Sequence, residues 1–424
     1  MFRMRRTGAT VLLIVLAISL AGVAPGVTQE ECAHRIGLVT DVGRLRDQSF
    51  NEASWNAIEQ AADELGLGEE CYDYIETQDS ADYIPNIELF ISEGYDIIVT
   101  SGEAMTTAMR EAGRMYPDVL FIGTDQPQLD EDRNYDPIPN VAGIVFDESV
   151  SGFLAGALAA SMSESGVIGG VYGTDIITPV VRFRLGYEEG ARYINPDIQV
   201  LGAYHPGTLD QAFVDPQWGA ETAKLMIDQG ADVIFGAGGQ TGNGALIAAC
   251  EAGLPVIGVD QDQYLTLPEV QACIMSSATK DLVNAVYGQI IMAAEGTFEG
   301  GEVVGPATLA PFHEWEDKIP DEVKATIEEI KGLIDAGEIE VCPADDPEWG
   351  VACFKPSAEA AEEMDGEALV NERCTVCHGL DEITANFGQD ATFWAETVDE
   401  MIATGAQLNE EEREVVIDWL ASQE

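Results

Sequence analysis

The chain is poor in basic residues. Its 424 residues include 20 Lys and Arg against 76 Asp and Glu, which gives a formal net charge of -56. A surface with this excess of acid repels phosphate backbones and anionic lipid headgroups. We therefore exclude nucleic acid as a partner. The acids are spread along the whole chain rather than gathered in a tail, which is typical of a solvated acidic surface.

Histidine is also scarce, with 4 residues in the whole chain. The sequence shows no pairing of a nucleophile with a base and no cluster of metal ligands with zinc-like spacing. The pattern "GAGGQTGNG" at 236–244 resembles a dinucleotide fingerprint, but Thr241 stands where the third glycine belongs. We therefore predict no catalytic site and interpret this chain as a non-enzyme.

Long apolar runs are absent after the first residues. The run "VLLIVLAISLAGVA" follows "MFRMRRTGAT", which has three arginines and no acid. This order is typical of a secretory signal peptide, which we assign to residues 1–28, with a retained membrane anchor as the alternative. No later segment is long and apolar enough to cross a bilayer. We therefore expect a periplasmic or extracytoplasmic protein with no membrane insertion after cleavage.

Eight cysteines in an exported chain indicate an oxidising compartment. Cys374 and Cys377 belong to a separate motif described below, and the remaining six allow 15 pairings. Proximity to the expected strands and loops favours three of them: Cys32–Cys71, Cys250–Cys273 and Cys342–Cys353.

Short apolar runs alternate with amphipathic ones between residues 35 and 300. Such alternation predicts an α/β fold with mostly parallel sheets covered on both faces by helices. About 300 residues is large for one such sheet, so we expect two lobes. The expected strands are "RIGLVTDV", "YDIIVTSG", "DVLFIGTD", "NVAGIVFD", "GVIGGVYG", "IQVLGAYH", "ADVIFGAGG", "PVIGVD" and "ACIMSSAT".

Polar or glycine residues follow five of these strands. In open α/β sheets ligands bind beyond the carboxyl ends of the strands, so this repetition predicts a polar small-molecule site. The alternative is that each aspartate caps the following helix. The residues concerned are Asp41, Ser101, Gly102, Asp125, Gly238, Gly239 and Asp260.

The segment "IGLVTDVGRLRDQSFNEASWNAIEQAADELG" resembles the opening of the basic membrane protein family, the purine nucleoside receptors of ABC importers. "YPDVLFIGTD", "NVAGIVFDESVSGFLAGALAA" and "ADVIFGAGGQTGNGALIAACEAGLPVIGVDQDQ" continue the resemblance in order, over about residues 35–342. It implies a two-lobed periplasmic binding protein of type I, assigned here to residues 29–345, that binds a purine nucleoside and delivers it to an ABC permease.

The resemblance also implies the binding residues. Phe50 and Phe183 are expected to sandwich the base, one from each lobe, and Asp47 and Asp125 to accept hydrogen bonds from its edge. The ribose hydroxyls are expected to contact three further residues: Gly239, Asp260 and Lys280. Core packing is the alternative for Phe183, and a contact that fixes the start of the following helix is the alternative for Phe50.

Two arginines depart from the pattern of the family. Arg44 stands where the family usually has glycine, and Arg46 follows closely. They either admit a more anionic ligand or pair with acids on the surface.

The end of the chain carries a different signal. After an acidic linker at 346–365, residues 366–424 contain "CTVCH", in which Cys374 and Cys377 would attach a haem covalently and His378 would bind its iron. Zinc and thiol–disulfide exchange are weaker alternatives, because no second ligand pair and no preceding strand is apparent. Of the two methionines in reach, Met401 is expected to bind the iron on the side opposite His378, and Met364, which precedes the attachment helix, is the alternative.

The closing pattern "VDEMIATGAQLNEEE" resembles class I c-type cytochromes, which implies a small all-α domain carrying one haem c for electron transfer. We interpret the whole chain as a nucleoside-binding protein of an ABC importer with an appended haem module, whose redox partner the sequence does not name. The alternative is a periplasmic electron carrier whose binding domain senses or docks a metabolite.

Overall fold

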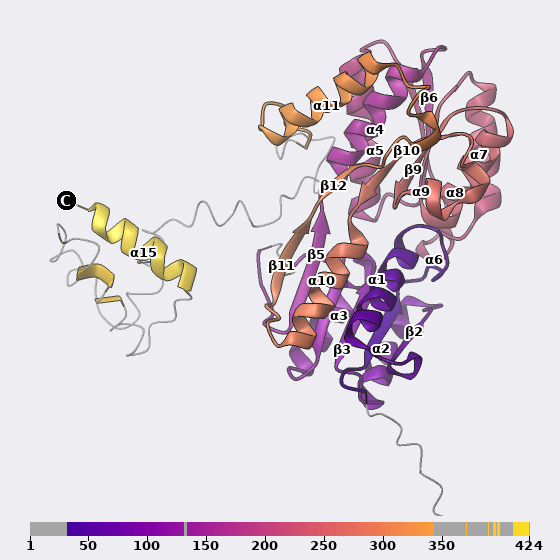
Figure 1. Ribbon diagram of the computed structural model, residues 1–424. Helices are drawn as coiled ribbons and strands as arrows, with labels where there is room; N and C mark the ends of the chain where they lie inside the picture. Colours follow the sequence, from indigo (N-terminus) through magenta and orange to yellow (C-terminus); the bar gives the residue numbers. More distant parts are fainter. Residues whose placement is uncertain are drawn as a thin grey trace, which may run out of the picture.

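The computed structural model describes residues 32–130, 134–342, 370, 389, 393–395, 397, 398 and 410–423. Residues 32–342 form two lobes, each built on a six-stranded sheet with helices on its faces (Figure 1). We call the lobe in which the described chain begins the N-lobe and the other one the C-lobe. The arrangement confirms the predicted α/β fold with two lobes.

The N-lobe sheet is entirely parallel, in the order β11-β5-β4-β3-β1-β2. Its central strands are buried on both faces, which explains their unbroken apolar sequences. The strands are β1 (Ile36–Thr40), β2 (Tyr72–Ile75), β3 (Ile97–Ser101), β4 (Leu120–Thr124), β5 (Val141–Phe146) and β11 (Gly301–Gly305). The helices are α1 (Phe50–Leu65), α2 (Tyr83–Ser92), α3 (Thr106–Met115) and α10 (Leu282–Glu295), with 3-10 turns at Glu69–Cys71, Ser80–Asp82 and Glu103–Met105.

The C-lobe sheet has the order β12-β10-β9-β8-β6-β7 and is parallel except for the antiparallel edge strand β12. Its strands are β6 (Val167–Tyr172), β7 (Gln199–Tyr204), β8 (Ile234–Ala237), β9 (Val256–Asp260), β10 (Ile274–Lys280) and β12 (Ala307–Leu309). Its helices are α4 (Glu148–Met162), α5 (Thr178–Ile194), α6 (Leu209–Ala212), α7 (Pro216–Asp228), α8 (Gly239–Glu251), α9 (Gln263–Thr266) and α11 (Asp321–Asp335), with 3-10 turns at Pro268–Val270 and His313–Trp315.

Helices α4 and α5 pack with their backbones almost in contact. A Cβ atom at Gly156 would lie 1.9 Å from the carbonyl oxygen of Tyr187, and one at Gly190 would lie 1.9 Å from that of Phe153. Only glycine fits at these two positions. The close approach fixes α5, which carries Phe183, against α4.

The chain crosses between the lobes three times. It passes from β5 into α4, from β10 into α10, and from β11 into β12 through Pro306. The backbone N–H of Asp281 donates to the carbonyl of Pro306 at 3.0 Å, which ties two of the crossings together. Three adjacent crossings make a hinge about which the lobes can close.

The structure agrees with most predicted elements. All nine expected strands are present, and β2, β11 and β12 are additional to them. The disulfides Cys32–Cys71 and Cys250–Cys273 are confirmed. Cys342 is disulfide-bonded, but Cys353 lies outside the described residues, so the third pairing stays a prediction.

The end of the chain is described only in part. Helix α15 (Glu410–Ser422) is present, and Val370, Trp394, Val398, Val416, Ile417 and Leu420 form a hydrophobic cluster of their own. The predicted signal peptide and the predicted linker, with the domain boundaries in them, lie outside the described residues, as do Cys374, Cys377, His378 and Met401. No described helix has the length and apolar character that a membrane span needs.

Candidate functional site

A cavity lies between the lobes, at the carboxyl ends of both sheets. It encloses about 640 Å³ between its walls, including space open to solvent. The structure brings all seven predicted binding residues to it: Asp47, Phe50, Asp125, Phe183, Gly239, Asp260 and Lys280. Of the predicted strand endings, Asp41, Gly102 and Gly238 also line it, whereas Ser101 is buried behind it, where its hydroxyl donates to Asn51.

The two phenylalanines reach the cavity from opposite lobes. Phe50 is the first residue of α1, and Phe183 lies within α5. Phe183 also belongs to the C-lobe core, so its predicted binding role and the alternative of core packing both agree with its position. The Lys280 ammonium lies 4.6 Å from the centroid of the Phe50 ring and 5.5 Å from that of Phe183. The cavity is therefore bounded by two aromatic rings with a cation close to both.

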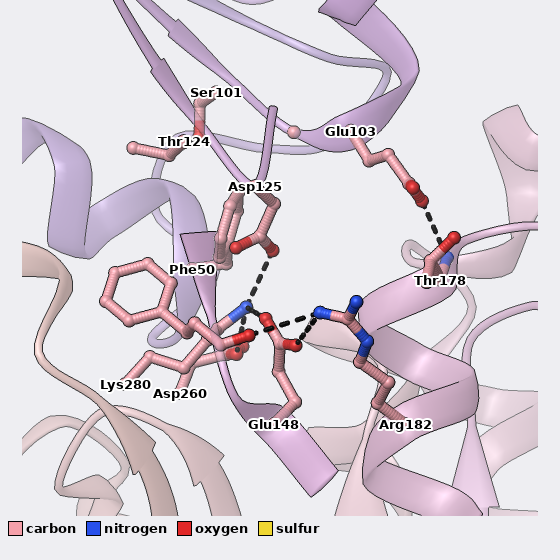
Figure 2. Close-up of polar contacts among 12 residues, drawn as sticks. Phe50, Ser101, Glu103, Thr124, Asp125, Glu148, Thr178, Arg182, Asp260 and Lys280 are labelled. Atoms are coloured by element: carbon pink, nitrogen blue, oxygen red, sulfur yellow. Dashed lines mark hydrogen bonds and ion pairs between the residues drawn. The ribbon is translucent and has the colours of Figure 1, made fainter. Parts of the chain in front are cut away.

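Lys280 is the centre of a buried charge cluster (Figure 2). Its Nζ atom lies 2.7 Å from Asp125 Oδ2, 3.5 Å from Asp260 Oδ1 and 3.6 Å from Glu148 Oε1. Burial alone would lower the pKa of Lys280, but these three carboxylates raise it above its usual value. The lysine is therefore held as a cation, and its charge is more than balanced by the acids around it.

Two members of this cluster were missed by sequence reasoning. Glu148 begins α4 directly after the hinge, and Arg182 of α5 donates to Glu148 Oε2 at 3.2 Å and to the carbonyl of Phe146 at 3.2 Å. Neither has a motif of its own. The one available signal was that Glu148 follows a buried strand closely. Acids at the start of a helix are common, so this position did not point to a site.

Asp125 has one oxygen left for a ligand. It follows β4 with a φ of 58°, a left-handed conformation that is uncommon outside glycine. Oδ2 accepts from Lys280, whereas Oδ1 is buried and has no hydrogen-bond partner in the described part of the chain. Burial raises the pKa of Asp125 to about 7, although the Lys280 ammonium opposes this rise. A buried acceptor without a donor in the wall of a cavity is suited to a ligand N–H or O–H.

Asp47 is more heavily engaged than the sequence suggested. Its Oδ1 accepts from the backbone N–H groups of Ser49 and Glu52, and its Oδ2 accepts from that of Asn51. Burial raises the pKa of Asp47 to about 7, against the effect of these hydrogen bonds. Its carboxylate satisfies the start of α1, so a contact with the base would have to be added to this capping role.

The residues expected at the ribose come from the ends of three C-lobe strands, with Lys280 at the end of β10. Gly239 follows β8 with a φ of 54°, and Asp260 ends β9 with a φ of 65°. Asp260 Oδ2 accepts from the Ser49 hydroxyl of the N-lobe at 2.6 Å, while its Oδ1 faces Lys280. Asp125 and Asp260 thus lie in one charge cluster, although the sequence assigned them to opposite ends of the ligand.

The two unusual arginines differ in position. Arg44 lines the cavity and lies 3.4 Å from Glu76, with its side chain 47% exposed. Arg46 does not line the cavity and pairs with Glu52 and Glu59. The alternative of pairing with surface acids therefore describes Arg46 fully and Arg44 in part.

Other residues complete the wall. Burial raises the pKa of Asp41 to about 7. Gly102 has a φ of 113°, and a Cβ atom there would lie 2.3 Å from Asp41 Oδ2, so this position needs glycine. Asn51, Glu103, Val180 and Phe213 were not predicted. Phe213 follows the short helix α6 in a connecting segment that has no periodic pattern to reveal it. Among the described residues, no three His, Cys, Asp or Glu side chains gather as metal ligands would.

Comparison with known proteins identifies the two-lobed part. The Bmp family model, described as "ABC transporter substrate-binding protein PnrA-like", matches residues 35–305, which is more than half of the chain. The chain belongs to the Bmp family. A relative of this Bmp protein, basic membrane protein A1 of Borrelia garinii, is 30% identical over 314 residues, covering 72% of this chain and 87% of the relative.

Two further similarities agree. An uncharacterised lipoprotein of Pyrococcus horikoshii is 32% identical over 311 residues, covering 69% of this chain and 72% of the relative. A solved solute-binding protein of an ABC transporter system from Aeropyrum pernix matches with a TM-score of 0.65 and 25% identity, covering 80% of this chain and 97% of that structure. This Bmp protein therefore has the type I periplasmic binding protein fold and is a substrate-binding protein of an ABC transporter, with a small-molecule ligand and a permease as partner.

Proposed function

We propose that the cavity binds a purine nucleoside for import. The observation that carries this proposal is the pair of phenylalanines that line one cavity from opposite lobes, Phe50 and Phe183. A flat ring held between aromatic faces gains contact area and favourable stacking. Two lobes that each supply one ring would trap such a ligand when they close.

The polar groups suit the rest of a nucleoside. The unpartnered Oδ1 of Asp125 would accept from an N–H on the edge of the base. Asp260, Gly239 and Lys280 line the C-lobe side and would bind the ribose hydroxyls. Since the Lys280 charge is already balanced by three carboxylates, an uncharged nucleoside fits this wall better than a phosphorylated one.

Calorimetric titration of the exported full-length protein tests this proposal. Adenosine, guanosine and inosine are compared with ribose and with an amino acid, and Phe50→Ala is measured beside the wild type. We expect binding of at least one nucleoside at micromolar concentration or below, weakened by Phe50→Ala. Binding of a sugar or amino acid with no heat from any nucleoside would refute it.

We also propose that residues 366–424 carry one covalent haem c. Cys374 and Cys377 would attach it, and His378 and Met401 would bind the iron. Two observations support the fit. Six apolar side chains form a separate buried cluster in this segment, and the indole N–H of Trp394 within it is buried without a hydrogen-bond partner among the described residues. A carboxylate of a bound haem would be a suitable acceptor for this N–H.

Bound haem supplies reversible one-electron transfer at its iron. The residues of this segment would enclose it and hold its two faces, and we assign the chain no catalytic role. Acid–acetone extraction of the exported protein tests the covalent attachment. The haem should stay with the protein, and Cys374→Ala together with Cys377→Ala should release it.

Export and the membrane partner complete the proposal. We infer that residues 1–28 direct the chain to the periplasm and that the closed, nucleoside-loaded form docks on the permease. The haem unit would exchange electrons there with a redox partner. Nucleoside uptake that survives deletion of residues 366–424 would support this function over the alternative, a periplasmic electron carrier whose binding domain senses or docks a metabolite.

A further inference from the structure

The lobes contact each other through a short segment of which only the first residue lines the cavity. This segment, Asp47–Ser49, precedes α1 in the N-lobe. Its three consecutive carbonyl oxygens all accept hydrogen bonds from side chains of the C-lobe. We call these hydrogen bonds the closure contact.

The donors come from α8 and from the segment around α9, at the edge of the C-lobe that faces the N-lobe (Figure 1). Asn243 Nδ2 donates to the carbonyl of Asp47 at 2.8 Å. The carbonyl of Gln48 accepts twice, from Gln263 Nε2 at 3.1 Å and from Thr266 Oγ1 at 2.9 Å. Gln261 Nε2 donates to the carbonyl of Ser49.

Both sides of the closure contact are fixed within their own lobes. In the N-lobe, the Asp47 carboxylate holds the segment by accepting from the start of α1, and Gln48 keeps a φ of 58°. In the C-lobe, Gln263 Oε1 accepts from the Val259 N–H at 2.9 Å, and Gln263 Nε2 also donates to Asn243 Oδ1 at 2.8 Å. Acceptors and donors are thus preformed, so closing the lobes costs little further ordering.

The closure contact is coupled to the cavity at one residue from each lobe. The Asp47 side chain lines the cavity while its carbonyl belongs to the contact. Asp260 lines the cavity from the C-lobe and accepts from the hydroxyl of Ser49, the third residue of the segment. A ligand that draws these two walls together also brings the donors and acceptors of the closure contact within hydrogen-bonding distance.

We propose that the closure contact sets how long the protein holds its ligand, and that Gln263 and Thr266 are affinity-determining positioning residues that never touch the ligand. Their hydrogen bonds exist only while the lobes are closed, so they slow reopening and hence ligand release. The proposal does not depend on which small molecule fills the cavity.

The test replaces one hydroxyl in the full-length protein. Thr266→Val keeps the shape of the side chain and removes its hydrogen bond to the Gln48 carbonyl, and Thr266→Ser restores the hydroxyl. The matched control is Thr279→Val, which removes a hydroxyl bond of 3.0 Å to the Thr308 carbonyl inside the C-lobe. Adenosine, guanosine and inosine are the probes, and stopped-flow tryptophan fluorescence follows release.

Thr266→Val removes one net hydrogen bond from the closed state, so this variant should release ligand about three- to tenfold faster than the wild type. Its association rate should be nearly unchanged. Thr266→Ser should release at close to the wild-type rate, and so should Thr279→Val. The proposal would be overturned if Thr266→Val released ligand at the wild-type rate, or if Thr279→Val accelerated release as much as Thr266→Val does.

A failure of the nucleoside proposal is separable from a failure of this one. If the wild type binds none of the three probes, only the nucleoside assignment fails. The ligand that does give heat in the titration, ribose or the amino acid, then serves as the release probe. Faster release from Thr266→Val than from Thr279→Val supports the closure contact, and equal release rates refute it.

Discussion

Replacing Asp125 with asparagine should reverse the hydrogen-bonding character of one cavity wall. In the wild type, Oδ2 accepts from Lys280 Nζ at 2.7 Å and Oδ1 is left as an acceptor towards the ligand. The lysine ammonium can only donate, so it selects the oxygen of the new amide. The Nδ2 group must then face the ligand. Two donors would meet there, because the ligand N–H that would have donated to Oδ1 now points at another N–H.

The magnitude follows from losing a hydrogen bond to a charged acceptor. Such a bond contributes about 1.5–3 kcal/mol, so the dissociation constant for a nucleoside with an N–H on the facing edge should rise about 10- to 150-fold. The free energy of unfolding should change by less than the free energy of binding, because Lys280 keeps Asp260 and Glu148 as partners.

Titration calorimetry and thermal unfolding of Asp125→Asn give the two quantities. The matched control is Asp136→Asn, which also removes a carboxylate from a buried cation, Arg110, but lies outside the cavity. It should bind nucleoside as the wild type does. An affinity for Asp125→Asn within about threefold of the wild type would show that Oδ1 does not contact the ligand.

Four other predictions can be checked with the same preparations. Asp260→Ala should weaken nucleoside binding by about 1.5–3 kcal/mol and leave binding of the free base nearly unchanged, as measured by calorimetry. Burial raises the pKa of Asp41 from 3.8 to about 7, so the folded state binds more protons than the unfolded state between these values. The unfolding temperature should therefore fall as the pH rises through this range, with a smaller slope in Asp41→Asn. Gly102→Ala should lower the unfolding temperature, because alanine is strained at a φ of 113° and its Cβ atom meets a carboxylate. Met401→Ala should abolish the low-spin absorption spectrum of the haem and open the iron to added cyanide; an unchanged spectrum would point to Met364 as the ligand.

The sequence was sufficient for strands that are buried on both faces. β1, β3 and β9 have unbroken apolar sequences because helices cover both sides of the sheet. β11 was missed because it lies at the sheet edge, with Val304 half exposed, and has glycine at both ends. Its strand conformation depends on pairing with β5, which is far away in the sequence.

The site was predicted in composition but not in its electrostatics. Strand-end aspartates can be read from local sequence, since the fold brings those ends together. The pairing of Asp125 with Lys280 joins residues 155 apart in the sequence, and Glu148 enters through the hinge. Such contacts depend on how the two lobes meet, which no local pattern records.

The two described disulfides divide the covalent constraint between the lobes. Cys32–Cys71 closes 39 residues within the N-lobe, and Cys250–Cys273 closes 23 residues within the C-lobe. Cross-links of these lengths restrict the unfolded chain by about 3–4 kcal/mol each in the chain-entropy model. Neither of them joins one lobe to the other. The two cross-links therefore stiffen each lobe separately and leave the relative motion of the lobes to weak, reversible bonds. A reductant should lower the unfolding temperature without altering the rate at which ligand is released.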